Sequence, residues 1–356
     1  MQPRLGWGLV RVPGHHSAAV SWAVALTLLM PAFGAGQTVL GVEGTRFTIN
    51  GEPTFLLGIS YYGGAAAPAE TVRRDLDDLA ERGINWIRVW ATWVSGDENT
   101  SAVTGSGEPR PPYFDQLVEL VRLADERGIV VDVTLTRGPL GPRPTEEALT
   151  KVEDHCRAAS VLAAALRGFR NVYIDMANER DVRDARFVPY EELARIRAAI
   201  RDVDPERLVT ASGVDDGGAK HLKGHLEVAG EDFICPHLGR DPGSPGRTEK
   251  QTRQYLATMA EMGHLAPVHY QEPFRRAYGA WQPEAEDFLT DLAGAVRGGA
   301  AGWCLHNGSP RGGAAGPARS FDLRPGQPRL MEQLDEVELD VLRRMANTAA
   351  EARAGR

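Results

Sequence analysis

The sequence predicts a single-domain α/β protein built as a (β/α)8 barrel, and its pattern of apolar segments carries this prediction. Short apolar runs alternate with longer segments of helical periodicity, and eight such runs occur between residues 55 and 305. Strands that alternate with helices form a parallel sheet, and eight such units close into a barrel. An open doubly wound sheet would need a glycine-rich phosphate turn after an early strand, and the sequence has none. The predicted strands are 55–60, 84–90, 129–135, 172–176, 208–211, 233–235, 268–270 and 302–305.

The segments between these runs read as helices and loops. A β-hairpin with Asn50-Gly51 at its turn precedes the first strand. Gly83 and Gly128 end the first two helices, as glycine commonly does. Long segments rich in Gly, Pro and Ser follow several strands, where barrels carry their active-site loops. The predicted helices are 71–82, 114–127, 146–166, 190–203, 252–261, 285–296 and 331–349, and the predicted loops are 96–112, 136–145, 238–248 and 306–320.

Composition narrows the class of partner. The 356 residues carry a formal net charge of −8, with acidic and basic residues interspersed along the chain. No basic stripe or polybasic segment occurs, so we expect no nucleic-acid partner and no electrostatic membrane anchor. A neutral or weakly charged substrate fits this balance better than a polyanion. The three cysteines are widely spaced, which predicts small buried hydrophobes rather than disulfides or metal ligands.

The N-terminus has the pattern of an export signal. Two arginines precede an uncharged apolar run at 18–30, Pro31 ends the run, and small residues follow up to Gly36. We therefore expect residues 1–36 to be a signal peptide, with an uncleaved single anchor as the alternative. The remaining chain, 37–356, is the predicted barrel domain, located outside the cytoplasm as a secreted or periplasmic protein.

The C-terminal ends of the predicted strands bring together residues suited to glycoside hydrolysis. Barrel enzymes carry their chemistry at these ends. Cleavage of a glycosidic bond needs one carboxyl group that donates a proton and a second that stays ionised. Aromatic side chains supply platforms for sugar rings, and this chemistry calls for neither a metal ion nor a cofactor. The strand-end candidates are Glu179 and Glu272 for catalysis, and Arg88, Asn178, His237, Trp303, Tyr61, Tyr62 and Trp90 for substrate binding.

Several local motifs are similar to those of a known family. The chain resembles the cellulase-like glycoside hydrolases of family 5 and the wider clan A of retaining barrels. The resemblance runs from the hairpin into the last strand. It rests on Phe47-Thr48-Ile49-Asn50-Gly51-Glu52-Pro53, Gly83-Ile84-Asn85-Trp86-Ile87-Arg88-Val89, Ala177-Asn178-Glu179, Gln271-Glu272-Pro273 and Gly302-Trp303.

The resemblance implies a role for each matching residue. Glu179 is the expected acid/base, and Glu272 is the expected nucleophile of a double displacement on a β-linked glucan or mannan. Asn178 would hold the sugar 2-hydroxyl, Arg88 would support the nucleophile, and Trp303 would form the floor of the cleavage subsite. The two carboxyl groups are then expected to lie about 5–5.5 Å apart, as in retaining enzymes.

The chain departs from the family pattern at two strand ends. Thr136-Arg137 ends the third strand, where family 5 usually carries a histidine. His237-Leu238 ends the sixth, so the tyrosine hydroxyl that usually contacts the nucleophile is missing.

Three other functions remain open at this level. A metal-dependent sugar isomerase would ligate a divalent ion with Glu179, His237, Glu272 and an acid at Asp215 or Asp216. A non-catalytic barrel that only binds glycans would keep the aromatic platforms, but it would normally lose one of the two glutamates. A transglycosylase would use the same residues as the hydrolase.

Overall fold

The computed structural model describes residues 1, 37–138, 148–214, 218–308, 319 and 321–355. The expected signal peptide and most of the predicted loops at 136–145 and 306–320 therefore lie outside the described residues, as do Asp215 and Asp216. The chain divides into two compact units at Gly34 and Ala35, and only the second is described below. Of the helices in the described ranges, none is both long and apolar enough to cross a membrane.

The strands of the second unit form a closed ring of eight positions, which confirms the predicted (β/α)8 barrel. Seven strands pair in parallel in the order β10-β9-β8-β5-β4-β14-β13. The fifth position continues from β10 into β11, which pairs in parallel with β12. A parallel bridge between Ile234 and Val268 then joins the sixth position to the seventh and closes the ring. The strands are β4 (Leu56–Ser60), β5 (Trp86–Trp90), β8 (Val130–Thr134), β9 (Val172–Asp175), β10 (Val209–Thr210), β11 (Ser212–Gly213), β12 (Cys235–Pro236), β13 (His269–Tyr270) and β14 (Gly302–Leu305).

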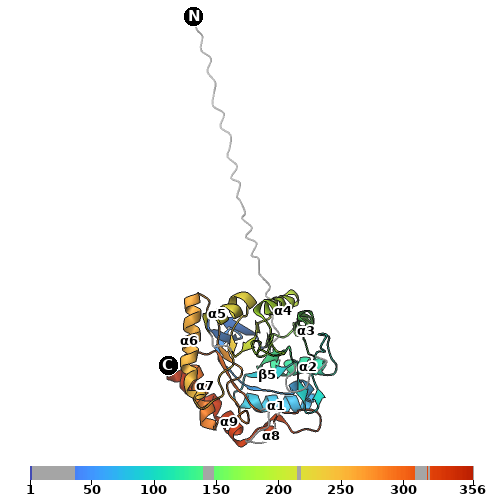
Figure 1. Ribbon diagram of the computed structural model, residues 1–356, viewed down its shortest axis with the longest axis vertical. Helices are drawn as coiled ribbons and strands as arrows, with labels where there is room; N and C mark the ends of the chain where they lie inside the picture. The colour runs from blue at the N-terminus through green and yellow to red at the C-terminus, as the bar shows by residue number, and fades with distance from the viewer. Residues whose placement is uncertain (2–36, 139–147, 215–217, 309–318, 320, 356) are drawn as a thin grey trace. The chain divides into compact units, whose positions relative to one another are not determined.

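Helices surround this ring, as Figure 1 shows. Each predicted helix is present, with ends that shift by a few residues in most cases. Two short helical segments that the sequence did not predict follow β11, namely α5 (Ala219–Lys223) and the π-helical turn η2 (Gly224–Ala229). The other helices are η1 (Gly64–Ala66), α1 (Ala69–Glu81), α2 (Tyr113–Asp125), α3 (Val152–Ala165), α4 (Tyr190–Val203), α6 (Ser244–Met262), α7 (Ala285–Gly298), α8 (Leu330–Gln333) and α9 (Glu336–Ala354).

Two helices differ clearly from the prediction, and their ends explain why. Helix α6 begins at Ser244 rather than 252, because Pro245 suits the first turn of a helix and the polar sequence there hid its start. The predicted helix at 331–349 is two helices. Asp335 accepts a hydrogen bond from the Glu338 backbone N–H and starts α9 with a capping box, which separates it from α8.

Alternation along each strand sorts side chains between the barrel interior and the helices. On β5, Ile87 and Val89 pack in the large cluster between sheet and helices, whereas Trp86 lies in a smaller buried cluster with Leu56 and Tyr173. Successive side chains of a strand point to opposite faces, so Arg88 shares the interior face with Trp86. The interior is therefore apolar at its base and becomes charged one layer higher.

The hairpin before β4 is as predicted, and it seals the base of the barrel. Strands β2 (Arg46–Ile49) and β3 (Glu52–Thr54) pair antiparallel across a two-residue turn, in which Asn50 and Gly51 both have positive φ. An unpredicted strand, β1 (Leu40–Glu43), pairs with β2 on its other side. Phe47 is fully buried and meets the Phe233 ring at 4.9 Å. Access to the barrel interior therefore comes from the opposite end, where the strands terminate.

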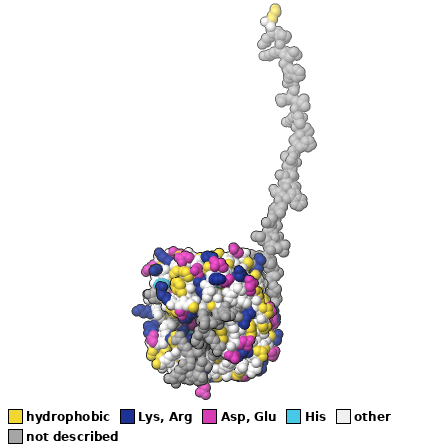
Figure 2. All heavy atoms as spheres, turned by 45° about the vertical axis from the view of Figure 1, so that its right-hand side comes forward, with side chains coloured by type: hydrophobic (Ala, Val, Ile, Leu, Met, Phe, Trp, Pro, Cys, Tyr) yellow, Lys and Arg dark blue, Asp and Glu magenta, His cyan; other side chains and the backbone are white. Residues whose placement is uncertain are grey.

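The outer surface and the cysteines match the expectations from composition. Acidic and basic side chains intermix on the face shown in Figure 2. Cys156, Cys235 and Cys304 are all free, and the last two are buried. The predicted absence of a disulfide among these three cysteines is confirmed.

Candidate active site

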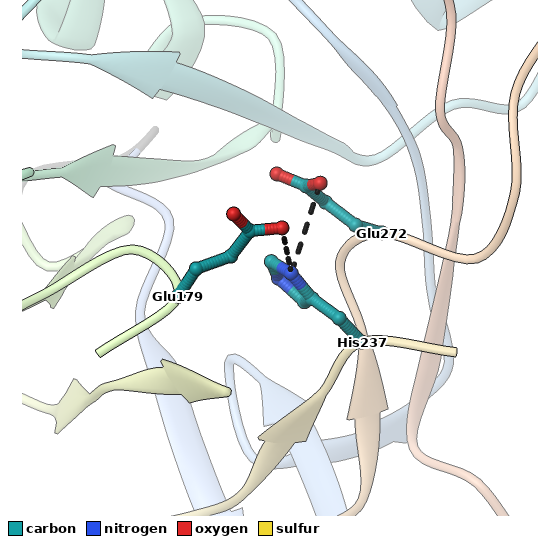
Figure 3. A group of neighbouring side chains, drawn as sticks. All are labelled: Glu179, His237 and Glu272. Atoms are coloured by element: carbon teal, nitrogen blue, oxygen red, sulfur yellow. Dashed lines mark ion pairs between the residues drawn. The ribbon is translucent and has the colours of Figure 1, made fainter. Parts of the chain in front are cut away.

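The two predicted catalytic glutamates meet at the C-terminal end of the barrel. Glu179 follows β9 and Glu272 follows β13, and His237 at the end of β12 lies between them (Figure 3). His237 Nδ1 lies 3.5 Å from Glu179 Oε1 and 3.7 Å from Glu272 Oε2. One carboxylate oxygen of each glutamate and this ring nitrogen all lie within 4.8 Å of one another. The side chains of Glu179 and Glu272 keep 14% and 6% of their surface exposed, so a ligand reaches both from the open end.

Backbone hydrogen bonds continue past the short strands and fix this meeting point. The His237 N–H donates to Gly213 O at 2.7 Å, and the Leu238 N–H donates to Glu272 O at 3.2 Å. Glu179 has a φ of 48°, a left-handed conformation that side-chain-bearing residues rarely adopt. Its N–H donates to Ser212 Oγ at 3.1 Å, which helps to hold the strained residue. Strain of this kind persists where the surroundings over-determine it, often at functional sites.

Arg88 organises the layer directly below the two glutamates. Its guanidinium is fully buried and donates to Glu272 Oε1 at 2.6 Å and to Asn178 Oδ1 at 2.8 Å. It also pairs with Asp175 at 2.9 Å and with Asp132 at 3.3 Å. The expected support of Glu272 by Arg88 is therefore present as a direct contact. Asp132 and Asp175 are fully buried on β8 and β9 and pair with Arg88 inside the barrel.

The second oxygen of Glu272 faces further positive or polar groups. Arg240 Nη2 lies 2.8 Å from Oε2, and His306 Nε2 lies 3.6 Å from it. Burial raises the pKa of Glu272, but His237, His306, Arg88 and Arg240 together lower it well below the ordinary value. Arg240 thus supplies the donor to the nucleophile that the His237-Leu238 sequence lacks. The sequence reasoning missed it because it lies in the loop after β12 rather than at a strand end.

Glu179 has a different environment from Glu272. Arg186, from the loop between β9 and α4, pairs with its Oε2 and also with Asp184. Burial raises the pKa of Glu179, whereas the His237 imidazole and the Arg186 guanidinium lower it, with a net shift below the ordinary value. The downward shift is the stronger at Glu272. A single proton entering the pair therefore favours Glu179, which is the division that one acid and one nucleophile require.

Tyr62 and Trp90 are buried beside this site. The Tyr62 ring stacks on Trp90 at 4.4 Å and on Trp93 at 4.7 Å, and its hydroxyl contacts His306 Nε2 at 2.6 Å. The Arg88 guanidinium lies 4.4 Å from the centre of the Trp90 ring. These two predicted residues therefore belong to the wall next to Arg88 and His306. Their expected role as sugar platforms stays a prediction.

Tyr61 and Trp303 face away from the site, so their predicted contact with sugar is wrong. The Tyr61 hydroxyl donates to Asp75 on α1 at 2.9 Å, and Trp303 Nε1 donates to Asp291 on α7 at 2.6 Å. Both rings are fully buried between the sheet and the helices. On β14, alternation turns Trp303 and Leu305 outward and leaves Cys304 on the interior face. His306, one step beyond the strand, lies beside Glu272 instead.

A pocket opens beside His237 and extends toward α6. It meets the site at His237, and its lining mixes polar and apolar groups. The lining residues other than His237 are Val214, Leu238, Gly239, Gln251, Gln254 and Tyr255.

Several solved structures of glycoside hydrolases have a similar fold. A family 5 mannosidase from Rhizomucor miehei superposes with a TM-score of 0.62 at 14% identity, over 90% of this chain and 99% of that one. A family 5 glycoside hydrolase from Bacteroides vulgatus gives 0.62 at 17% identity, over 87% and 71% of the two chains. The β-mannanase of the blue mussel Mytilus edulis gives 0.55 at 17% identity, over 86% and 96%. These likenesses confirm the barrel fold.

No family model matches the chain, and no curated protein matches it. Two of the structural neighbours are named as glycoside hydrolases of family 5, the family whose motifs the sequence resembles.

Proposed function

We propose that this protein is a retaining glycoside hydrolase, with Glu179 as acid/base and Glu272 as nucleophile. The observation that carries the proposal is the approach of the two carboxylates to within 4.8 Å at their nearest oxygens. Retaining enzymes hold their carboxyl groups about 5–5.5 Å apart, whereas inverting enzymes leave about 6.5–9.5 Å for a water molecule. Glu179 and Glu272 have the closer spacing.

In the first step, a Glu272 oxygen attacks the anomeric carbon as the bond to the leaving oxygen breaks. Glu179 gives its proton to that oxygen, so the leaving sugar departs as an alcohol. In the second step, Glu179 takes a proton from water, and the resulting hydroxide displaces Glu272 from the anomeric carbon. The glycan is thereby cleaved with retention, and both glutamates return to their starting forms.

The surrounding residues support these steps electrostatically. Arg88 and Arg240 each contact one oxygen of Glu272 and keep it ionised for attack. Arg88 also holds Asn178 by its side-chain oxygen, which orients the residue expected to bind the sugar 2-hydroxyl. The pocket beside His237 offers the amides of Gln251 and Gln254 to a neighbouring sugar.

The metal-dependent isomerase is disfavoured by the charge around the same residues. Glu179, His237 and Glu272 have the spacing of a metal-binding group. However, Arg240 lies within 4 Å of both carboxylates, and Arg88 takes the remaining oxygen of Glu272. A divalent cation at this point would face fixed positive charges on two sides, which opposes its binding. The presence of both glutamates likewise argues against a barrel that only binds glycans.

A β-linked mannan or glucan is the starting substrate class, because the sequence motifs resemble family 5 and two of the neighbours named above are a mannosidase and a mannanase. We also propose that residues 1–36 direct export, on the strength of their apolar run and small residues. An N-terminal sequence of the protein recovered from the medium or periplasm that begins near residue 37 would support this. An intact Met1 in the cytoplasmic fraction would contradict it.

Sugar release from a panel of β-mannans, β-glucans, xylans and aryl β-glycosides tests the function. We expect activity on one substrate class that is lost in Glu272→Gln and kept in Glu249→Gln, an equal chemical change on the outer helix α6. A chelator should leave the activity intact. Wild-type activity in Glu272→Gln would remove Glu272 as the nucleophile, and loss of activity with the chelator would favour the isomerase.

A further inference from the structure

One arginine beside the active site has no acidic partner. Arg275 follows Glu272 by three residues, and its Nη1 lies 3.1 Å from His306 Nε2 and 3.3 Å from the Tyr62 hydroxyl. Its Nε is buried without a hydrogen-bond partner. Among the residues that the structure describes, no carboxylate forms an ion pair with it, whereas Arg88, Arg186 and Arg240 at the same site each have one. A buried donor without a partner is costly, so a ligand that accepts from it would be favoured.

The Arg275 guanidinium lies close to the reacting groups. His306 Nε2, which accepts from Arg275, is 3.6 Å from Glu272 Oε2. An N–H donor at this distance means that Nε2 carries no proton, and burial lowers the pKa of His306 well below its ordinary value. Arg275 and Arg240 also lie over the same Tyr278 ring, at 5.0 and 4.3 Å from its centre, so the two guanidinium groups share one aromatic wall.

The charge of the site becomes positive when the reaction requires it. Beside Glu179 and Glu272, Arg186, Arg240 and Arg275 provide three guanidinium groups, and Asp184 provides one further carboxylate. Glu179 must be protonated to donate to the leaving oxygen, and this leaves three positive groups facing two negative ones.

The layer below these groups does not offset this charge. Arg88 lies there between Asp132 and Asp175. Burial raises the pKa of both acids, which opposes a full negative charge on each of them.

We propose that the active site recognises an anionic sugar, a glycoside of a uronic acid whose carboxylate pairs with Arg275 next to the cleaved bond. This inference rests on the proposed glycosidase function and names its substrate class. Arginine presents a planar fork that matches a carboxylate, and Arg275 has no acidic partner among the described residues. The net charge of −8 repels a polyanion at long range. A single carboxylate on one sugar interacts mainly with the charged groups nearest to it, which here include Arg275.

Matched pairs of aryl glycosides test this assignment. The 4-nitrophenyl β-glucuronide, β-mannuronide and β-galacturonide are compared with the corresponding neutral glycosides, and kcat/KM is measured for each. We expect the wild type to favour the uronide in one pair by at least about tenfold, the worth of a hydrogen bond to a charged group. Arg275→Gln should lower this uronide-to-neutral ratio by about ten- to hundredfold. Arg276→Gln is the matched control, because Arg276 pairs with Asp335 away from the site and the ratio should stay as in the wild type.

Two results would overturn the inference. One is a wild type that cleaves the neutral member of every pair at least as well as the uronide. The other is an Arg275→Gln variant that loses both members of a pair equally. If no glycoside is cleaved at all, the proposed function fails, and binding then tests the inference alone. NMR titration with glucuronate, mannuronate and galacturonate against the neutral sugars should show uronate binding that Arg275→Gln abolishes, and its absence would overturn the anionic subsite.

Discussion

Replacing Arg88 by methionine tests whether this residue supports both the stability of the fold and the catalytic activity. Its guanidinium contacts Asp132, Asp175 and Glu272, and all four side chains are almost completely buried. The methionine fills much of the same space without the charge. Arg88→Met therefore leaves three buried carboxylates without their shared partner, and we expect it to lower both the stability of the fold and the activity.

The size of the loss follows from the acids. Removing one member of a buried ion pair costs about 3–5 kcal/mol. An aspartate escapes this cost by binding a proton, which for an ordinary value of 3.8 costs about 4 kcal/mol at pH 7, at about 1.4 kcal/mol per pKa unit. Both limits agree on about 4 kcal/mol. For the roughly 320 residues of the barrel domain, this corresponds to a fall in Tm of about 5–7 °C.

The loss should depend on pH with a definite sign. Burial raises the pKa of Asp132 and Asp175 in the folded protein above their unfolded values. The protonated form is thus favoured by folding, and its contribution to stability is lost as the pH rises through the folded pKa. Without Arg88 this loss is larger, so the deficit of Arg88→Met should be smaller at pH 5 than at pH 7.

Thermal unfolding followed by circular dichroism measures these values, with kcat/KM measured on the same preparations. Arg207→Met is the matched control. Arg207 is also buried, and it pairs with Asp204 at 2.8 Å. It contacts Val172 at the start of β9, whereas Glu179 follows the end of that strand. We expect Arg207→Met to lower Tm while keeping kcat. An Arg88→Met protein that unfolds within about 1 °C of the wild type at pH 7 would refute the reasoning.

Three further variants test other parts of the account. Glu179→Gln should lower kcat/KM by about 10²–10⁴-fold for glycosides with poor leaving groups and much less for those with good ones, and an equal loss for both would contradict its role as the acid. Arg186→Gln removes a positive charge that lowers the pKa of Glu179, so the basic limb of the kcat/KM–pH profile should move to higher pH, and an unmoved limb would speak against the contact. Trp303→Phe loses the indole hydrogen bond to Asp291, a buried acid whose pKa is raised to about 7. It should cost about 1–3 kcal/mol of stability with kcat/KM unchanged, whereas a selective loss of activity would return Trp303 to the site.

The sequence was sufficient for the parts of the site that the barrel itself positions. Glu179, Glu272 and His237 end their strands, and the order of strands around a barrel brings these ends together whatever the loops do. Arg88 could be predicted in the same way, because it shares the inner face of β5 with Trp86. Periodicity alone gave these positions, and the family resemblance added their roles.

The parts that were missed depend on features that sequence periodicity does not carry. Arg186, Arg240 and Arg275 reach the site from loops, whose paths are set by tertiary contacts rather than by a repeating pattern. The error at Trp303 was one of register, since a shift of one residue on a strand moves a side chain to the opposite face. Counting by two along β14 would have pointed to His306, because residues 302, 304 and 306 share the inner face.

Trapping the covalent intermediate directly tests whether Glu272 is the nucleophile of a double displacement. A 2-deoxy-2-fluoro glycosyl fluoride of the preferred sugar slows the second step of a double displacement more than it slows the formation of the glycosyl-enzyme. The account predicts one added glycosyl group per protein molecule in the intact mass spectrum, located on Glu272 by peptide mapping and absent in Glu272→Gln. A protein that turns the reagent over without any added mass, or that carries the label on another residue, would contradict it.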